Sequence, residues 1–410
     1  MKSRFVVVYL GFVILNANAL TLKESESVAL KQAPELKRLL KEKDAYQHLS
    51  IGQSQWMDPM LELGAMNLPT NSFHINQENM TQFKVGVRQI IPKGSSLKFK
   101  QIIETIKANK SFSEHALMRI EILKLVRMIW VERIYWRQVR WILLKQRATF
   151  NHLVDVTHSL YENNKAQQKD VFNAKMQLSK VHEQIVHAKR AYQATTAKLA
   201  RWIGNKNASA SHPKSMPRFL RLPKLDVQQN NLNVHPLLKK DSDIVALNKA
   251  KADLIKEDFK PGFTVGVSYG YRDTMPNGMK RTDFLSIGLG VSLPINKKNK
   301  QRENYKASLA NVSASLYQKR SDFNKLNELL SDTYVQWLSS GDKVHIYRTK
   351  LLPDARSYAK ASLISYQNAK LDFPTLANGY AELYKLEIIK QQLRFMQAKQ
   401  KINLLFLNGI

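Results

Sequence analysis

The chain has 410 residues, none of them cysteine, and it contains only 15 glycines and 13 prolines. Without cysteine it has no disulfide framework, no thiolate metal site and no cysteine to carry a lipid. Because few residues break regular structure, most of the chain can form long helices and strands. Acidic residues are also scarce, since 33 Asp and Glu stand against 64 Lys and Arg, which gives a formal net charge of +31.

A charge excess of this size is typical of nucleic-acid-binding proteins. The basic residues are, however, spread along predicted helices and do not form one block with interleaved aromatic residues. The N-terminus also indicates export from the cytoplasm. We therefore expect no nucleic-acid partner and a solvated surface that faces phosphate groups.

The N-terminus has the pattern of a secretory signal peptide. Two cations precede an apolar run from Phe5 to Leu15, and Ala17 and Ala19 supply a small-x-small cleavage pattern. Residues 1–19 are therefore expected to be removed, so that the mature chain begins at Leu20. A membrane anchor is the weaker interpretation, because the run is shorter than the roughly 20 apolar residues of a spanning helix.

Several prolines, glycines and tip residues recur at a fixed offset. Pairs 202 residues apart are Pro34 and Pro236, Pro59 and Pro261, Gly64 and Gly266, Gly86 and Gly288, and Pro92 and Pro294; pairs 205 apart are Tyr161 and Tyr366, Lys165 and Lys370, and Gly204 and Gly409. One structural unit is therefore predicted twice, in residues 20–204 and 234–410, with residues 205–233 as a linker. The first unit opens with a capping box at Thr21 and Glu24.

Four segments alternate between apolar and polar or tiny residues. They are Met60–Leu68, Thr81–Ile91, Phe263–Tyr271 and Leu285–Leu293. Strands of about 10 residues with this alternation fit a tilted crossing of an outer membrane, although a soluble sandwich would alternate in the same way. Four strands are too few to close a barrel, and lipid forbids open sheet edges. A trimer, with about 12 strands, would close one.

The long helical segments carry a coiled-coil signal. Apolar residues step three and four positions from Leu309 to Trp337, and only Lys319 and Thr333 interrupt this heptad seam. The stretch from Ser95 to Leu160 contains no proline or glycine. Its length of about 100 Å as a helix would cross most of a periplasm. Pro353 is expected to kink or weaken the second long helix.

The sequence contains no catalytic motif with the spacing that its chemistry requires. His182 and His187 stand five residues apart, whereas a zincin helix requires four. No phosphate-binding loop, nucleophile elbow or dinucleotide fingerprint occurs, and Gly288-Leu289-Gly290 lies within a predicted strand. Four methionines lie near the first hairpin, at Met57, Met60, Met66 and Met80. Strand-end packing is favoured over soft-metal capture for them, so we expect no enzyme, cofactor or metal.

Short segments along the chain stand in a characteristic order. They are Ala33-Pro34-Glu35-Leu36, Met57-Asp58-Pro59-Met60, Val87–Pro92, Pro261-Gly262-Phe263, Ile287–Pro294, Leu351-Leu352-Pro353 and Tyr366-Gln367-Asn368-Ala369-Lys370. In order and doubled spacing, the chain resembles the TolC-like outer-membrane efflux factors over essentially its whole mature length. It is most similar to the branch that serves heavy-metal and multidrug resistance-nodulation-division (RND) pumps.

The resemblance implies a mainly α fold with a small β part. Long coiled-coil helices of a homotrimer would form a periplasmic α-barrel, continued by a 12-stranded transmembrane β-barrel with four strands from each chain. The linker 205–233 would form a belt around the tunnel. The implied function is a passive exit duct in the outer membrane, among outer-membrane lipids, that pairs with a periplasmic adaptor and an RND-type inner-membrane pump. A periplasmic coiled-coil adaptor or scaffold is the alternative, but it would have no use for four membrane-length strands.

The resemblance also implies a periplasmic gate at the helix tips. The corresponding residues are Tyr161, Asn164, Asp170, Tyr366, Lys370, Leu371, Asp372, Thr375 and Asn378. Tyr366 and Asp170 match a hydrogen-bonded latch. Leu371 stands in place of a second latch cation, and Thr375 and Asn378 in place of an acidic constriction ring. The latch should therefore be weaker, and the constriction less cation-selective, than in the family.

Two departures from the family pattern lead to further expectations. The family has glycine in each tip turn, where this chain has Asn164 and Ala369. Because asparagine tolerates a left-handed backbone and alanine does not, the second turn is expected to be built differently. Lys93-Gly94-Ser95 replaces an aromatic residue and a Gly-Lys pair that are frequent in the branch. This difference counts against the heavy-metal branch.

Basic residues also follow the second and fourth predicted strands. They are Lys93, Lys98, Lys100, Lys297, Lys298, Lys300 and Arg302. We expect these rim cations at the periplasmic rim of the barrel. There they would set its depth through anionic lipid headgroups, at about 1 kcal/mol for each cation.

Overall fold

The structure is a computed structural model that describes residues 20–210 and 215–410. The predicted signal peptide lies outside the described residues. The chain divides into two compact units, one from the described parts of residues 1–36, 118–233 and 326–410, the other from residues 37–117 and 234–325. Each unit thus draws on both halves of the sequence, and the predicted repeat boundaries stay a prediction.

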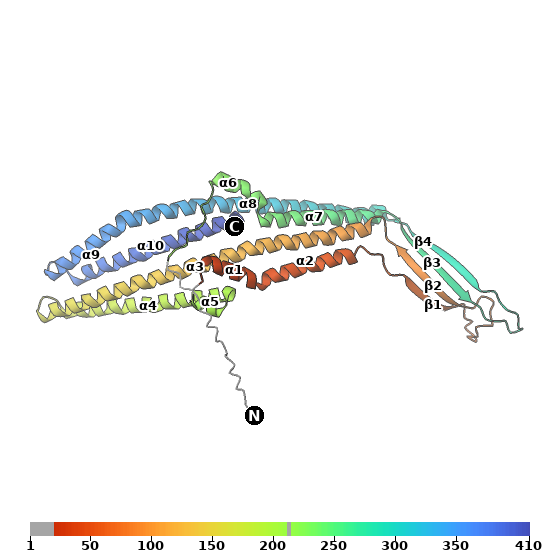
Figure 1. Cartoon of the computed structure of the whole chain (residues 1–410), viewed down its shortest axis with the longest axis horizontal. Coiled ribbons are helices and arrows are strands. Elements are labelled where there is room, and N and C mark those ends of the chain that lie inside the picture. Colours follow the sequence, from red (N-terminus) through yellow and green to blue (C-terminus); the bar gives the residue numbers. More distant parts are fainter. Residues whose placement is uncertain (1–19, 211–214) are drawn as a thin grey trace, which may run out of the picture. The chain divides into compact units, whose positions relative to one another are not determined.

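The order of helix, hairpin, long helix and helix occurs twice (Figure 1). The first series consists of α2 (Pro34–Gly52), β1 (Met60–Met66), β2 (Gln82–Ile91), α3 (Ser96–Glu162) and α4 (Gln168–Ile203). The second consists of α7 (Pro236–Lys256), β3 (Gly262–Tyr271), β4 (Phe284–Ser292), α8 (Arg302–Ile346), α9 (Leu352–Gln367) and α10 (Phe373–Leu407). Short helices α1 (Leu22–Gln32), α5 (Asn205–Ala210) and α6 (Leu225–Asn231) complete the fold. The predicted helices and strands are confirmed to within a few residues.

Helix starts and interruptions follow from local chemistry. The amide of Glu24 donates to the Thr21 hydroxyl, and the Thr21 amide donates to the Glu24 carboxylate at 2.7 Å, which confirms the capping box at the start of α1. The helix breaks before Pro34, where α2 begins. Pro353 does not end the second long helix, because a wider π-turn at Tyr347–Leu351 joins α8 to α9. The predicted local disturbance is thus confirmed.

The first unit has two main apolar clusters. One packs α1, α3 and α4 together around Ala29, Ile122 and Leu199, all fully buried. The other lies near the helix tips and joins Phe150 of α3 and Ala174 of α4 to Phe373 of α10. No described helix combines the length and the apolar character that a membrane crossing requires.

Burial differs along the heptad seam of α8. In the first unit Leu330 is fully buried, whereas in the second unit Leu309 and Leu316 are 44% and 48% exposed. The seam therefore packs within the chain only along its C-terminal part. Its N-terminal part presents apolar side chains that are left largely open to solvent on this chain.

All four strands belong to one antiparallel sheet with the order β1-β2-β3-β4. The register pairs Glu62 with Gly86, Gly86 with Ser268, and Ser268 with Ser286. Because side chains alternate along a strand, this register places residues of the same kind on the same face. The outer strands β1 and β4 each have a neighbour on one side only.

Candidate functional site

The sheet sorts its side chains onto two contrasting faces. One face carries large apolar residues, including Leu63 and Leu289, which are 71% and 77% exposed. Other exposed members of this apolar face are Leu61, Phe83, Val85, Val87, Phe263, Val267, Tyr269, Tyr271, Leu285, Ile287 and Val291. A sheet face of this size and character is normally covered by protein or lipid.

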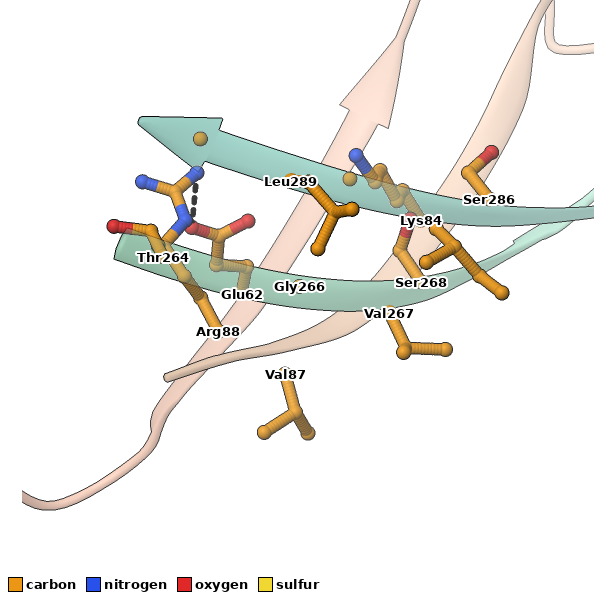
Figure 2. Close-up of a pocket in the computed structure, with 13 residues that line it drawn as sticks. Glu62, Lys84, Val87, Arg88, Thr264, Gly266, Val267, Ser268, Ser286 and Leu289 are labelled. Carbon is orange, nitrogen blue, oxygen red and sulfur yellow. Dashed lines mark ion pairs between the residues drawn. The ribbon is translucent and has the colours of Figure 1, made fainter. Parts of the chain in front are cut away.

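The middle of the opposite face is polar and hollowed, and Met60, Met66 and Ile90 lie on this face near the strand ends. A cavity of about 460 Å³ lies on it, lined by the side chains of Glu62, Lys84, Arg88, Thr264, Ser268 and Ser286 (Figure 2). Gly86 lies opposite Ser268, and a Cβ atom at Gly86 would stand 2.8 Å from the Cβ atom of Ser268. Small residues are therefore required where these strands approach on the hollow side.

Charge on this polar face is only partly balanced. Arg88 of β2 forms an ion pair with Glu62 of β1, with 2.6 Å between Nη2 and Oε1 (Figure 2). Lys84 lies opposite Gly64 on one side and Gly270 on the other, so its directly opposed neighbours offer no carboxylate. Among the ion pairs of the described residues, none involves Lys84. The alternation along each strand does not mark Glu62, Lys84 and Arg88 as one site, because their proximity depends on which strands pair.

The two helix-tip turns are closed in the same way. Asn164 and Ala369 both have a left-handed backbone, with φ of 56° and 52°. The amide of the following lysine donates to a carbonyl five residues earlier, at 2.8 Å for Lys165 and 2.9 Å for Lys370. This pattern is a Schellman closure. The expectation that the second turn would be built differently is therefore wrong, because the closing hydrogen bonds outweigh the resistance of alanine to this conformation.

The strain at Ala369 leads to a prediction. Ala369→Gly should stabilise the chain by about 1 kcal/mol, because glycine adopts the left-handed conformation without the penalty of a Cβ atom. Asn164→Gly is the matched control and should have a smaller effect, since asparagine already tolerates this conformation. Thermal unfolding followed by circular dichroism measures both. Equal effects of the two substitutions would contradict the interpretation.

Tyr366 of α9 is buried between helices of the first unit. Its hydroxyl donates to Thr157 Oγ1 of α3 at 3.4 Å, and its ring stands edge-on to Phe373 at 5.8 Å. Burial chiefly raises the pKa of Tyr366, and the nearby charge of Asp170 adds to this, whereas the hydrogen bond with Thr157 opposes it. Thr157 had not been predicted, because its role depends on how α3 packs against α9.

The other predicted gate residues have separate local roles. Asp170 accepts a hydrogen bond from the Gln167 amide at 3.2 Å at the start of α4, and it makes no hydrogen bond to Tyr366 in the described structure. Asp372 caps α10 by accepting from the Thr375 amide at 3.3 Å, and hydrogen bonding to Thr375 lowers its pKa. Leu371 packs against the tip cluster, while Tyr161, Lys370 and Asn378 are exposed. The latch between Tyr366 and Asp170 stays a prediction.

The rim cations lie in the second unit, directly after β2 and β4. Lys93 stands 3.7 Å from the Asp258 carboxylate, and the other six are exposed. Exposed Leu293 and Ile295 adjoin the second group. This combination of apolar and basic side chains is typical of a membrane–water boundary.

Within residues 20–210 and 215–410, no three His, Asp or Glu side chains come together in a group that would hold a metal ion. His187 instead packs edge-on against Trp136, with 5.5 Å between ring centroids.

No protein-family model matches the chain, and no curated protein sequence matches it. Solved structures do match. The outer-membrane channel OprN has a TM-score of 0.80 at 12% identity, covering 95% of this chain and 89% of that one. The outer membrane protein VceC from Vibrio cholerae has a TM-score of 0.78 at 12% identity, covering 95% and 96%.

The open state of the MtrE outer membrane channel of Neisseria gonorrhoeae has a TM-score of 0.73 at 11% identity, covering 95% of this chain and 88% of that one. The heavy-metal branch is not distinguished by these matches. At 11% to 12% identity, similarity over nearly the full length of both chains establishes a shared fold. The chain has the fold of the TolC-like outer-membrane channels.

Proposed function

We propose that this protein is the outer-membrane exit duct of a tripartite efflux or export system. It conducts substrates passively from a periplasmic adaptor and an RND-type inner-membrane pump to the exterior. It spans the outer membrane with its strands and extends into the periplasm with its helices. The duct itself performs no chemistry.

The four-stranded sheet carries this proposal. Its apolar face is exposed, its polar face is hollowed, and its strands of 7 to 10 residues are close to the length of a tilted membrane crossing. A periplasmic adaptor would not need a sheet with one exposed apolar face and one polar face.

A homotrimer would satisfy the groups that a single chain leaves open. The edge strands β1 and β4 run in opposite directions, so β4 of one copy can pair with β1 of the next in the antiparallel pattern of the sheet. Three copies would close a barrel and leave no edge in lipid. The exposed part of the heptad seam on α8, at Leu309 and Leu316, would then find partners on neighbouring helices.

Cell fractionation tests the proposed function. Under the duct proposal, the protein sediments with outer membranes, migrates as a trimer until heated in detergent, and gives stepwise conductance in planar bilayers. Recovery of a conductance-free monomer in the soluble periplasmic fraction would instead support the adaptor alternative.

The helix tips supply a prediction about gating. A phenol–carboxylate hydrogen bond contributes about 1.5–3 kcal/mol, so three copies of a latch between Tyr366 and Asp170 would hold the tunnel shut with roughly 4–9 kcal/mol. The charge of Asp170 acts on Tyr366, where it adds to the rise in the pKa of the phenol, and this supports the proposal. Tyr366→Phe combined with Asp170→Ala should give a larger and longer-lived open state in planar bilayers.

An exposed tyrosine outside the gate offers a matched control. Tyr317→Phe removes the hydroxyl of a tyrosine on α8 that is 74% exposed and is not one of the gate residues. It should leave conductance unchanged. If the double variant also conducts like the wild type, the two side chains do not form a latch.

The rim cations supply a second prediction. Replacing all seven by glutamine should reduce trimer yield and binding to vesicles that contain anionic phospholipid, because each cation near the membrane surface contributes about 1 kcal/mol. Replacement of the six lysines by arginine keeps the charge and should preserve both properties. Unchanged binding of the glutamine variant would mean that these residues are only solvated surface.

A further inference from the structure

We infer that the polar face of the sheet is an anion-attracting surface, with Lys84 as its decisive charge, so that the strand section of the duct favours anionic solutes. This inference rests on the proposed function, because it assumes that the hollow polar face borders the path of the solute. Beyond that function, it specifies the sign of charge of the solutes that the duct favours.

The geometry leaves Lys84 without an ion pair of its own. Arg88 is held by Glu62 at 2.6 Å, and this ion pair lies between β1 and β2 (Figure 2). Lys84 lies two positions before Gly86 on β2, between the glycines Gly64 and Gly270 of the adjacent strands. It is half-buried and lines the hollow. Because Glu62, its diagonal neighbour on β1, is paired with Arg88, the ammonium group of Lys84 acts on the space in front of the sheet without an ion pair of its own.

The rest of the polar face does not restore the balance. Its other cavity-lining polar side chains are the neutral hydroxyls of Thr264, Ser268 and Ser286, and glycines fill much of the remaining surface. Among the described residues of this face, Glu62 is the single carboxylate against two cations. Each copy of the chain therefore adds one net positive charge.

The loops beyond the strands leave this balance unchanged. Residues 67–81 and 272–283 contain three cations, Arg272, Lys280 and Arg281, and three carboxylates, Glu78, Asp273 and Asp283. Both arginines donate to main-chain carbonyls of the first loop, Arg272 to Asn79 at 2.6 Å and Arg281 to Asn76 at 2.7 Å. At the loop end of the sheet, the balanced charge of the loops means that the strands determine the sign of the local potential.

A ring of cations in a narrow channel has a large effect on permeating ions. Walls of low dielectric constant focus the field of fixed charges into the aqueous path, so one unpaired charge in each copy raises the local concentration of anions. In a threefold assembly the three copies of Lys84 would lie at one level of the duct. Phosphate- or carboxylate-bearing solutes would be attracted, and cationic solutes repelled, at that level.

Reversal potentials in a potassium chloride gradient test the inference on the purified full-length trimer in planar bilayers. Lys84→Gln should shift the reversal potential toward cation preference, and Lys84→Glu should shift it further in the same direction. Glu62→Gln should shift it toward anion preference, because it frees the charge of Arg88. Lys37→Gln removes the same charge from an exposed position on α2 and should leave the potential unchanged.

Heat-resistant migration of each trimer shows that the variant has assembled. Conductance with the same reversal potential in wild type, Lys84→Gln and Lys84→Glu would overturn the inference while leaving the duct proposal intact. A complete absence of conductance in the wild type and in the gate variant would overturn the duct proposal and this inference together.

Discussion

Phe373→Ala is expected to lower the free energy of unfolding by about 3–5 kcal/mol, the usual cost of removing a fully buried phenylalanine. Phe373 is 0% exposed at the start of α10, and its ring stands edge-on to that of Tyr366. The same cluster includes Phe150 of α3 and Ala174 of α4, so the substitution opens a cavity at the centre of the tip packing.

The chain offers a matched control for this substitution. Phe172 of α4 belongs to the same unit but is 61% exposed, and Phe172→Ala should change the free energy of unfolding by no more than about 0.5 kcal/mol. Denaturant unfolding followed by far-ultraviolet circular dichroism measures both variants. Similar losses for the two would mean that Phe373 is not the centre of the tip core.

Gly94→Ala is the second substitution with a large expected effect. Gly94 connects β2 to α3 with a φ of +46°, and a Cβ atom there would collide with the carboxylate of Glu257. That carboxylate accepts from the Ser95 amide at 2.7 Å and from Lys260 Nζ at 2.6 Å. Alanine at this position would be strained by the left-handed backbone and would also displace the hydrogen bonds of the Glu257 carboxylate. The free energy of unfolding should therefore fall by about 3–5 kcal/mol.

Gly278→Ala separates these two contributions. Gly278 has a φ of +84°, but no atom lies within 4 Å of where its Cβ would be. Its substitution should cost only the backbone penalty, about 1–2 kcal/mol. The yield of folded protein and the unfolding midpoint of both variants provide the measurement. If Gly94→Ala costs no more than Gly278→Ala, the Glu257 interactions contribute nothing to the turn.

The extent of the strands and long helices was predictable because local patterns determine them. Alternation defines β1 to β4, and the absence of proline and glycine allows the 67 residues of α3 to continue as one helix. The signal for the polar face was also present, since Glu62, Lys84 and Arg88 occupy alternate positions on their strands. Their pairing was not predictable, because it depends on which strand lies beside which.

Other features depend on packing that sequence patterns do not encode. The hydrogen bond between Tyr366 and Thr157 joins helices that are 209 residues apart in the chain. The left-handed Ala369 was missed because intrinsic propensity argues against it, while the hydrogen bonds of the tip closure favour it. Likewise, the two compact units combine segments of both predicted repeats.

The two unpaired edges of the sheet have a consequence for biogenesis. Before assembly, each chain offers free main-chain donors and acceptors at β1 and β4 together with a broad apolar face, which makes it a template for off-pathway pairing. In the proposed trimer, the correct neighbours must pair with these edges before incorrect ones do, so the yield of functional protein should depend steeply on the local concentration of newly made chains. Folding of the strand section and recruitment of its neighbours would then be a single kinetic event.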